Sequence, residues 1–166
     1  MNLFLEQRYQ YIVLEQVDHV RSQLKAITKT PWYDISVNLG GTVNDDYTFK
    51  LYSKLSLGIE VFNMPQNTAI ITGKLETQQD EQTIIYAAVR PNYFVLFALY
   101  LILVMFVFKL VDFFVSDRQD WFSITVLFIL FIVLRSHIHF SIGRLKNRFE
   151  RVILNQRNNL SITYHS

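Results

Sequence analysis

YFVLFALYLILVMFVFKLVDFFV at residues 93–115 and WFSITVLFILFIVLRSHIHF at residues 121–140 are the two apolar stretches that decide the fold of this chain. The first carries no charge up to Phe108, and a helix of its 23 residues would extend about 35 Å. A bilayer has a hydrocarbon core about 30 Å thick. A buried helix of a soluble protein is the alternative, but the 92 preceding residues are too few to wrap two such helices. We therefore predict a membrane-spanning helix.

The second stretch is free of charge only for its first 14 residues, or about 21 Å of helix. It spans the membrane only if Arg135, His137 and His139 extend toward the headgroups, as long basic side chains do near helix ends. A re-entrant or interfacial segment is the alternative that the sequence leaves open. We favour a transmembrane helical hairpin over residues 93–140, closed by the short polar link at 116–120.

Polar and large side chains within the hairpin allow two further predictions. Lys109 and Asp112 lie three residues apart, on one face of the first helix. They form either a buried charge pair on an ion or proton path, or a pair that neutralises itself near the outer interface, which we favour. Neither membrane helix contains a glycine, so close glycine-mediated packing is excluded. The helices must then pack through large side chains such as Phe97, Phe106, Phe128 and Phe131.

Charges and aromatic residues predict the orientation of the hairpin. The link at 116–120 carries two acids and one base, whereas five Lys and Arg residues follow residue 140. By the positive-inside rule both termini are cytoplasmic and the link is outside. The N-terminus shows no basic segment followed by an apolar run, so we expect no signal peptide. Tyr93 and Trp121 stand at helix ends, where aromatic residues mark membrane interfaces.

Residues 1–92 predict a cytosolic α+β domain. Apolar residues at 13, 17, 20, 24 and 27 are spaced as one face of a helix. Thr30-Pro31 ends it, because a residue before proline avoids the helical conformation. Alternating patterns predict strands at residues 35–39, 47–61, 68–75 and 83–90, with a fainter alternation at 3–11. Together these elements predict one helix packed on an antiparallel β meander of three to five strands.

The strand at 83–90 leads through Arg90-Pro91-Asn92 into the first membrane helix without a flexible linker. Proline suits the first turn of a helix, so we expect Pro91 there. The sheet cannot swing freely, because three residues extend no more than about 10 Å. One helix covers one sheet face, which leaves the opposite face free for the tail, a ligand, a protein partner or a second copy.

Residues 141–166 predict a short basic amphipathic tail helix, with Ile142, Leu145, Phe149, Val152 and Ile153 on its apolar side. Such a helix either lies on anionic headgroups, where each base contributes about 1 kcal/mol, or packs on the sheet. We favour packing under or beside the sheet, with Arg144 and Arg148 toward headgroups and Phe149 and Val152 toward protein. The residues expected at the membrane interface are Tyr93, Trp121, Arg135, Arg144, Lys146 and Arg148.

No residue pattern indicates catalysis, a metal site or a cofactor, so we do not expect an enzyme. The chain has no cysteine to ligate a metal. His137 and His139 would point about 200° apart on a helix and cannot share a metal. Asp45-Asp46 is interpreted as a turn rather than as a carboxylate pair for acid–base work. The basic tail adjoins a membrane, so we expect the lipid bilayer with its anionic headgroups as partner, and no nucleic acid.

Several short motifs occur in a fixed order along the chain: Gly41-Thr42-Val43, Tyr47-Thr48-Phe49-Lys50-Leu51, Asn63-Met64-Pro65, Gly73-Lys74-Leu75-Glu76, Thr83-Ile84-Ile85 and Phe149-Glu150. This layout resembles a family of small bacterial two-helix membrane proteins with an N-terminal cytosolic α+β domain. An Asn-Ser-Phe segment expected before Pro65 is absent. The resemblance implies a multi-pass protein of the bacterial inner (cytoplasmic) membrane and carries no activity to transfer.

Two hypotheses for function follow. The first is a non-enzymatic, membrane-anchored binding or scaffolding module. The second is a ligand-gated membrane effector whose hairpin oligomerises and perturbs the bilayer. Toxicity or dye leakage on induction would favour the effector, whereas harmless expression would favour the module.

Overall fold

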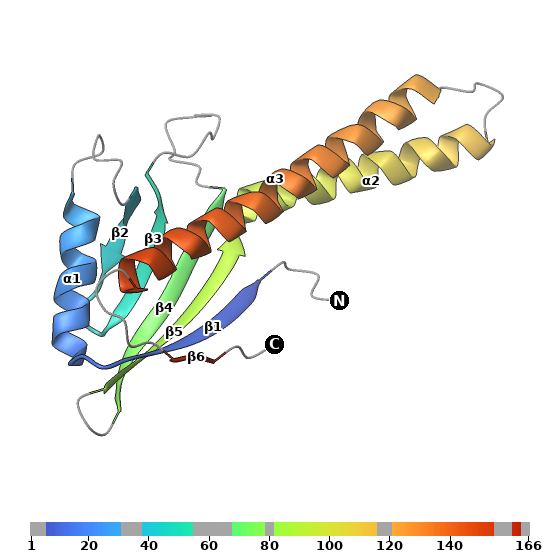
Figure 1. The fold of residues 1–166 in the computed structure, drawn as a ribbon. Helices are drawn as coiled ribbons and strands as arrows, with labels where there is room; N and C mark the ends of the chain where they lie inside the picture. Colours follow the sequence, from blue (N-terminus) through green and yellow to red (C-terminus); the bar gives the residue numbers. More distant parts are fainter. Residues whose placement is uncertain are drawn as a thin grey trace.

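The structure, a computed structural model, describes residues 6–30, 38–54, 68–78, 82–115, 121–154 and 161–163. Within these residues the chain forms an antiparallel sheet, a short helix and two long helices that extend away from the sheet (Figure 1). The predicted α+β class is confirmed. The elements in chain order are β1 (Gln7–Val13), α1 (Val17–Lys29), β2 (Leu39–Val43), β3 (Thr48–Ser53), β4 (Ala69–Gln78), β5 (Gln82–Pro91), α2 (Tyr93–Val115), α3 (Trp121–Leu154) and β6 (Ser161–Thr163).

The strand order in the sheet is β2-β3-β4-β5-β1-β6. Strands β2 to β5 form the predicted meander, and β1 pairs with the free edge of β5 along its whole length. The faint alternation predicted at residues 3–11 thus corresponds to β1 from Gln7 onward, and residues 3–5 lie outside the described residues. β6 pairs with β1 on its other side, so the prediction of a tail helix is wrong at Ser161–Thr163. The predicted strand positions 35–37 and 55–61 lie outside the described residues.

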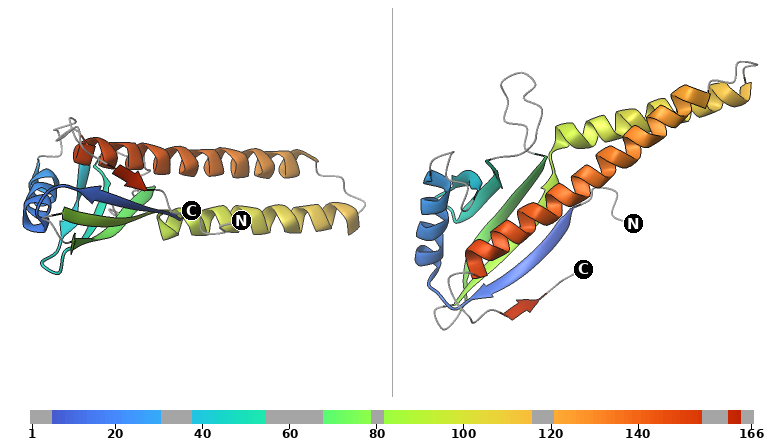
Figure 2. Two further views of the ribbon diagram at one scale, coloured as in Figure 1. Left: turned by 60° about the horizontal axis from the view of Figure 1, so that its bottom comes forward. Right: turned by 45° about the horizontal axis from the view of Figure 1, so that its top comes forward.

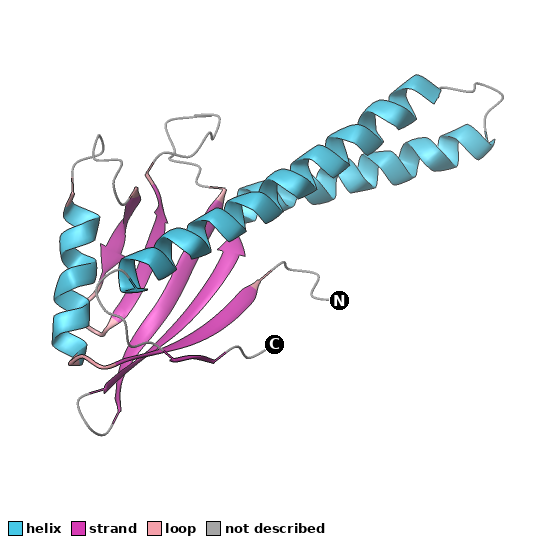
Figure 3. Ribbon diagram, in the orientation of Figure 1, coloured by secondary structure: helices cyan, strands magenta, loops and turns pink. Residues whose placement is uncertain are grey.

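The register gives the sheet one buried face, because side chains alternate along a strand. Odd-numbered residues of β1 to β5 share this face, as in the cross-strand row Gly41, Leu51, Ile71 and Val89. Leu51, Ile71 and Val89 are at most 1% exposed. Even-numbered residues form the opposite face, which we call the open face. Both α1 and α3 pack on the buried face, and no helix of the described residues covers the open face (Figure 3).

Helix α1 follows the predicted apolar spacing from Val17 onward, but Val13 is the last residue of β1, so the predicted start of the helix is wrong. Val20 and Leu24 are buried against the sheet, and Val17 and Ile27 pack at the margin of the same core. The helix ends at Lys29, and Thr30 has an extended backbone with ψ of 143°, as expected for a residue before proline.

Helix α3 is one continuous helix of 34 residues, about 51 Å long. The predicted boundary between a membrane helix ending at 140 and a separate tail helix is therefore wrong. A single stripe of buried and half-buried side chains, spaced three or four residues apart, runs along the helix. Its members are Ile124, Leu127, Phe131, Leu134, Ile138, Ile142, Leu145, Phe149 and Val152.

The stripe faces α2 in its first half and the sheet in its second half. Phe149 is 1% exposed, and its ring stacks on Phe49 of β3 at 5.7 Å and meets Tyr11 of β1 edge-on at 5.8 Å. The two arrangements that the sequence left open for the tail are therefore resolved. Residues 141–154 pack on the sheet, on the same face as α1.

The molecule has two layers that continue into the hairpin. Figure 2 (left) shows α2 extending the layer of the sheet and α3 extending the layer of the helices. The sheet and the two long helices thus share one long direction. A change at the junction would reorient the domain relative to the hairpin.

Two glycines offer a matched test of packing on the sheet and on α3. A Cβ at Gly73 would lie 2.3 Å from the Tyr86 carbonyl oxygen and 2.4 Å from the Phe49 ring, whereas a Cβ at Gly143 meets nothing within 4 Å. We expect Gly73→Ala to lower the free energy of unfolding by about 1–3 kcal/mol, because Phe49 must move. Gly143→Ala should leave it unchanged or raise it by up to about 1 kcal/mol. Denaturant unfolding in detergent micelles measures both, and equal effects would contradict the packing described.

Candidate functional site

The outer part of the hairpin exposes an almost purely apolar surface. The most apolar 18-residue windows of the two long helices are only 11% and 6% buried within the molecule, so the described chain leaves most of their apolar surface uncovered. Phe97, Phe114 and Phe122 are 65%, 76% and 79% exposed. Both helices are long and apolar enough to cross a membrane.

Aromatic contacts set the register between the two helices. Phe106 lies against Phe128 at 5.9 Å between ring centroids, and Phe113 lies against Trp121 at 4.4 Å. The predicted packing through large side chains is therefore confirmed for Phe106 and Phe128. Phe97 is 65% exposed, so its side chain contributes little to this packing.

The register gives the position of each polar group along the hairpin. If the same pairing of α2 with α3 is extended toward the sheet, Tyr93 lies beside residue 141. Arg135 then lies about 9 Å inside the level of Tyr93, within reach of the headgroups for a long side chain. Lys109 lies about 24 Å along the hairpin from that level. Lys109 and Asp112 are both exposed, and the choice between an interface pair and a buried ion path stays a prediction.

The junction of α2 with the sheet is capped by Asn92. Its side-chain oxygen accepts from the backbone N–H of Phe94 at 3.1 Å, and its carbonyl accepts from Leu96 N–H at 3.0 Å. Its own N–H donates to the Thr68 carbonyl at 3.0 Å. Pro91 is the last residue of β5, so the prediction that it begins the helix is wrong.

Two arginines sit on exposed aromatic rings at the sheet end of the hairpin. The Arg90 guanidinium lies 4.5 Å from the Tyr93 ring centre, and Arg144 lies 3.7 Å from that of Phe140. Tyr93 and Phe140 stand at about the same depth in the register above. An aromatic ring in contact with a basic side chain is expected at the interface between the lipid acyl chains and the headgroups of a membrane.

The other predicted interface bases contact the domain. Lys146 pairs with Glu150 at 3.6 Å and lies over the Tyr9 ring at 4.5 Å. Arg148 donates to the Ser53 hydroxyl at 2.5 Å, so its predicted orientation toward headgroups is wrong. Partial burial, together with the charges of Arg144 and Arg151, lowers the pKa of Arg148 below its ordinary value.

A polar contact that the sequence did not predict joins α3 to β1. The Tyr11 hydroxyl donates to the Glu150 carboxylate at 3.1 Å, and the Tyr11 side chain is otherwise buried. Glu150 thereby links Tyr11 and Lys146 across the helix–sheet interface. The only sequence signal for it was an acid beside Phe149 in an otherwise basic segment.

The sequence analysis considered two further residue pairs, Asp45-Asp46 for acid–base catalysis and His137 with His139 for metal binding. Asp45 pairs with Arg21 and with Lys25 of α1. Asp46 accepts from the Thr48 hydroxyl at 2.6 Å and from its N–H at 3.1 Å, and these hydrogen bonds lower the pKa of Asp46. His137 and His139 lie on helix α3, as predicted, and are exposed. No group of three or more His, Asp or Glu residues suited to a metal occurs in the part of the chain that is described.

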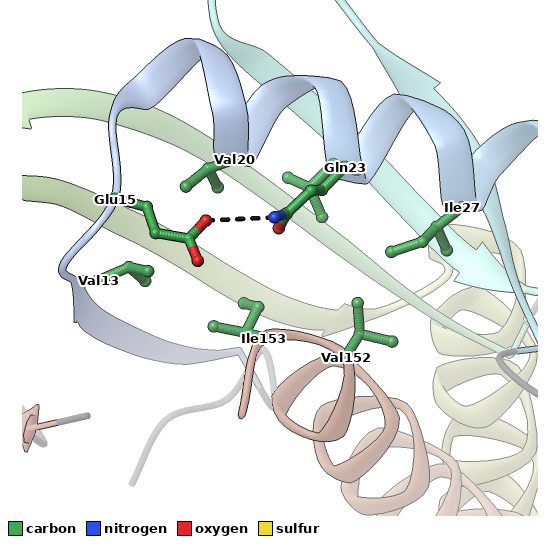
Figure 4. A pocket seen from close by; sticks show the side chains of 8 residues that line it. Val13, Glu15, Val20, Gln23, Ile27, Val152 and Ile153 are labelled. Carbon is green, nitrogen blue, oxygen red and sulfur yellow. Dashed lines mark hydrogen bonds between the residues drawn. The ribbon is translucent and has the colours of Figure 1, made fainter. Parts of the chain in front are cut away.

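A small pocket lies between α1 and the end of α3 (Figure 4). Apolar side chains line most of it, and the Gln23 amide donates to the Glu15 carboxylate at 3.2 Å on one wall. Its volume is about 20 Å³, enough for roughly one water molecule. The pocket therefore has no room for a metabolite.

Comparison of this chain with protein-family models, curated proteins and solved structures gives no match. The resemblance to small bacterial two-helix membrane proteins stays a prediction. The hairpin and its junction with the sheet are the candidate site on geometry alone.

Phe149 and Phe140 allow a matched test of this junction. Phe149→Ala should lower the free energy of unfolding of the domain by about 3–5 kcal/mol, because it leaves a cavity between Phe49 and Tyr11. Phe140→Ala should change it by less than about 1 kcal/mol, because Phe140 is 56% exposed. Denaturant unfolding with limited proteolysis of the α3 end reports both, and equal losses would mean that α3 is not docked on the sheet.

Proposed function

We propose that this chain is a two-pass protein of the bacterial inner membrane. Its α+β domain stands at the cytoplasmic surface as a non-enzymatic binding or scaffolding module. The observation that carries the proposal is the exposed apolar surface of the hairpin, since an aqueous protein rarely leaves a patch of this size uncovered. The paired Arg–aromatic contacts at one end of the hairpin support a headgroup boundary there.

The distribution of bases supports the orientation. Arg90, Arg135 and Arg144 lie at the sheet end of the hairpin, whereas the link at 116–120 carries Arg118 between two acids. The excess of bases favours the sheet end as the cytoplasmic side.

The mode of attachment favours a scaffold over a ligand-gated effector. The domain joins the hairpin twice, through the capped start of α2 and the unbroken α3, so it is held in a fixed pose. The pocket between α1 and α3 admits about one water molecule and gives ligand sensing no support.

Membrane insertion predicts a simple fractionation result. After alkaline carbonate washing, the full chain should stay in the membrane pellet, because the apolar helices remain in lipid while peripheral proteins are released. A variant with Val104→Asp and Ile129→Asp in the two exposed apolar stretches should be lost from the pellet. Release of the unmodified chain into the supernatant would disprove the proposed insertion.

The orientation predicts the behaviour of fusion reporters. A fluorescent protein fused after Ser166 should be bright, and alkaline phosphatase at the same position should be inactive, because both report a cytoplasmic location. Alkaline phosphatase inserted within 116–120 should be active and serves as the matched control. Phosphatase activity from the C-terminal fusion would reverse the topology.

A further inference from the structure

The open face of the sheet carries a ring of four bases. Thr72 of β4 and Ala88 of β5 pair at its centre and form a floor of small side chains. Lys50 of β3 pairs with Thr72, and Arg8 of β1 pairs with Ala88. The other two bases, Lys74 and Arg90, lie two residues along β4 and β5 on the same face. Cross-strand and diagonal neighbours are about 5–8 Å apart, so all four bases border one shallow area.

The charge of this area is only partly balanced. Arg8 pairs with Glu6 at 2.7 Å, and Lys74 pairs with Glu76 at 3.0 Å. Lys50 is exposed and makes no ion pair within the described residues. Arg8 and Lys74 each pair with one glutamate, and Lys74 also interacts with the charge of Asp46. Arg8, Lys50 and Lys74 are largely exposed.

The orientation of the sheet determines what can reach this face. A helix packed on a sheet lies parallel to the plane of the sheet, and α3 is both the packed helix and the proposed membrane helix. Figure 2 shows α3 running over one face of the sheet and continuing into the hairpin. If α3 lies along the membrane normal, the sheet stands on edge and its open face points sideways, parallel to the membrane plane. This step rests on the proposed membrane insertion. A face held on edge cannot lie flat on headgroups, so a lipid surface does not cover it.

Two other occupants fit poorly. A second copy docked through the same face would bring a second set of four bases against the first, and like charges oppose such a contact.

Single-stranded nucleic acid needs aromatic side chains on which its bases stack. The central positions here are Thr72 and Ala88, and Tyr86 is the only tyrosine of the face that is largely exposed among the described residues.

We propose that the open face docks an acidic segment of another polypeptide, held beside the domain at the membrane surface. Its carboxylates would lie over the floor of Thr72 and Ala88 and pair with Lys50, Lys74 and Arg8, while Arg90 stays on the Tyr93 ring. The inference names the class of partner that the proposed binding module recognises.

The test uses the full chain in nanodiscs of neutral phosphatidylcholine, with a fluorescein-labelled oligoglutamate peptide as probe. Fluorescence polarisation measures binding over a series of salt concentrations. The variant carries Lys50→Glu and Lys74→Glu on the open face. The matched control carries Lys29→Glu and Arg151→Glu, two exposed bases of the helical layer, and has the same net charge. We expect the open-face variant to bind at least about tenfold more weakly and the control to bind like the wild type.

Three results would overturn the inference: no binding of oligoglutamate to the wild type, equal losses in both double variants, or tighter binding of a single-stranded oligonucleotide than of the peptide. If Lys50→Glu with Lys74→Glu alters the circular dichroism spectrum, Lys50→Gln with Lys74→Gln decides instead, with a smaller loss expected. A chain that stays in the discs but fails to bind refutes only this inference. A chain that does not enter the discs refutes the proposed function.

Discussion

The packing of one side of α3 is the constraint on which the rest of the molecule depends. Leu134 packs toward α2, and Ile142 and Phe149 fill the space above the sheet, yet all three belong to the same stripe of one helix. A side chain removed from the second half uncovers the core of the domain. A break in the helix would loosen the domain from the hairpin, because only the short junction at Asn92 would still join them.

The sequence predicted the fold class and the hairpin because those features arise from local patterns. A run of apolar residues as long as a bilayer is thick requires a helix, and the period-two pattern around Phe49 requires a strand. The continuity of α3 was missed, because Arg135, His137 and His139 resemble the end of a membrane segment. The stripe from Ile124 to Val152 was present in the sequence, but it crosses that polar interval.

The candidate site was predicted less well, because its contacts join distant parts of the chain. The Tyr11–Glu150 hydrogen bond spans 139 residues, and no local pattern reports it. Arg148 looked like a headgroup contact because only its charge is visible in the sequence, and its partner Ser53 lies on another element. By contrast, Tyr93 and Trp121 begin the two long helices, as the apolar stretches alone predict.

The place of β1 in the sheet has a consequence for the order of folding during synthesis. β1 emerges first from the ribosome, but its partner β5 follows some seventy residues later, and Phe149 later still. In between, both apolar helices are synthesised, and the proposed insertion would place them in lipid. Within the described chain, the sheet therefore gains its last core layer only after the hairpin has left the ribosome. Under the proposed function, insertion would precede completion of the domain, because a chain that stops before residue 149 lacks the side chain that packs on Phe49 and Tyr11.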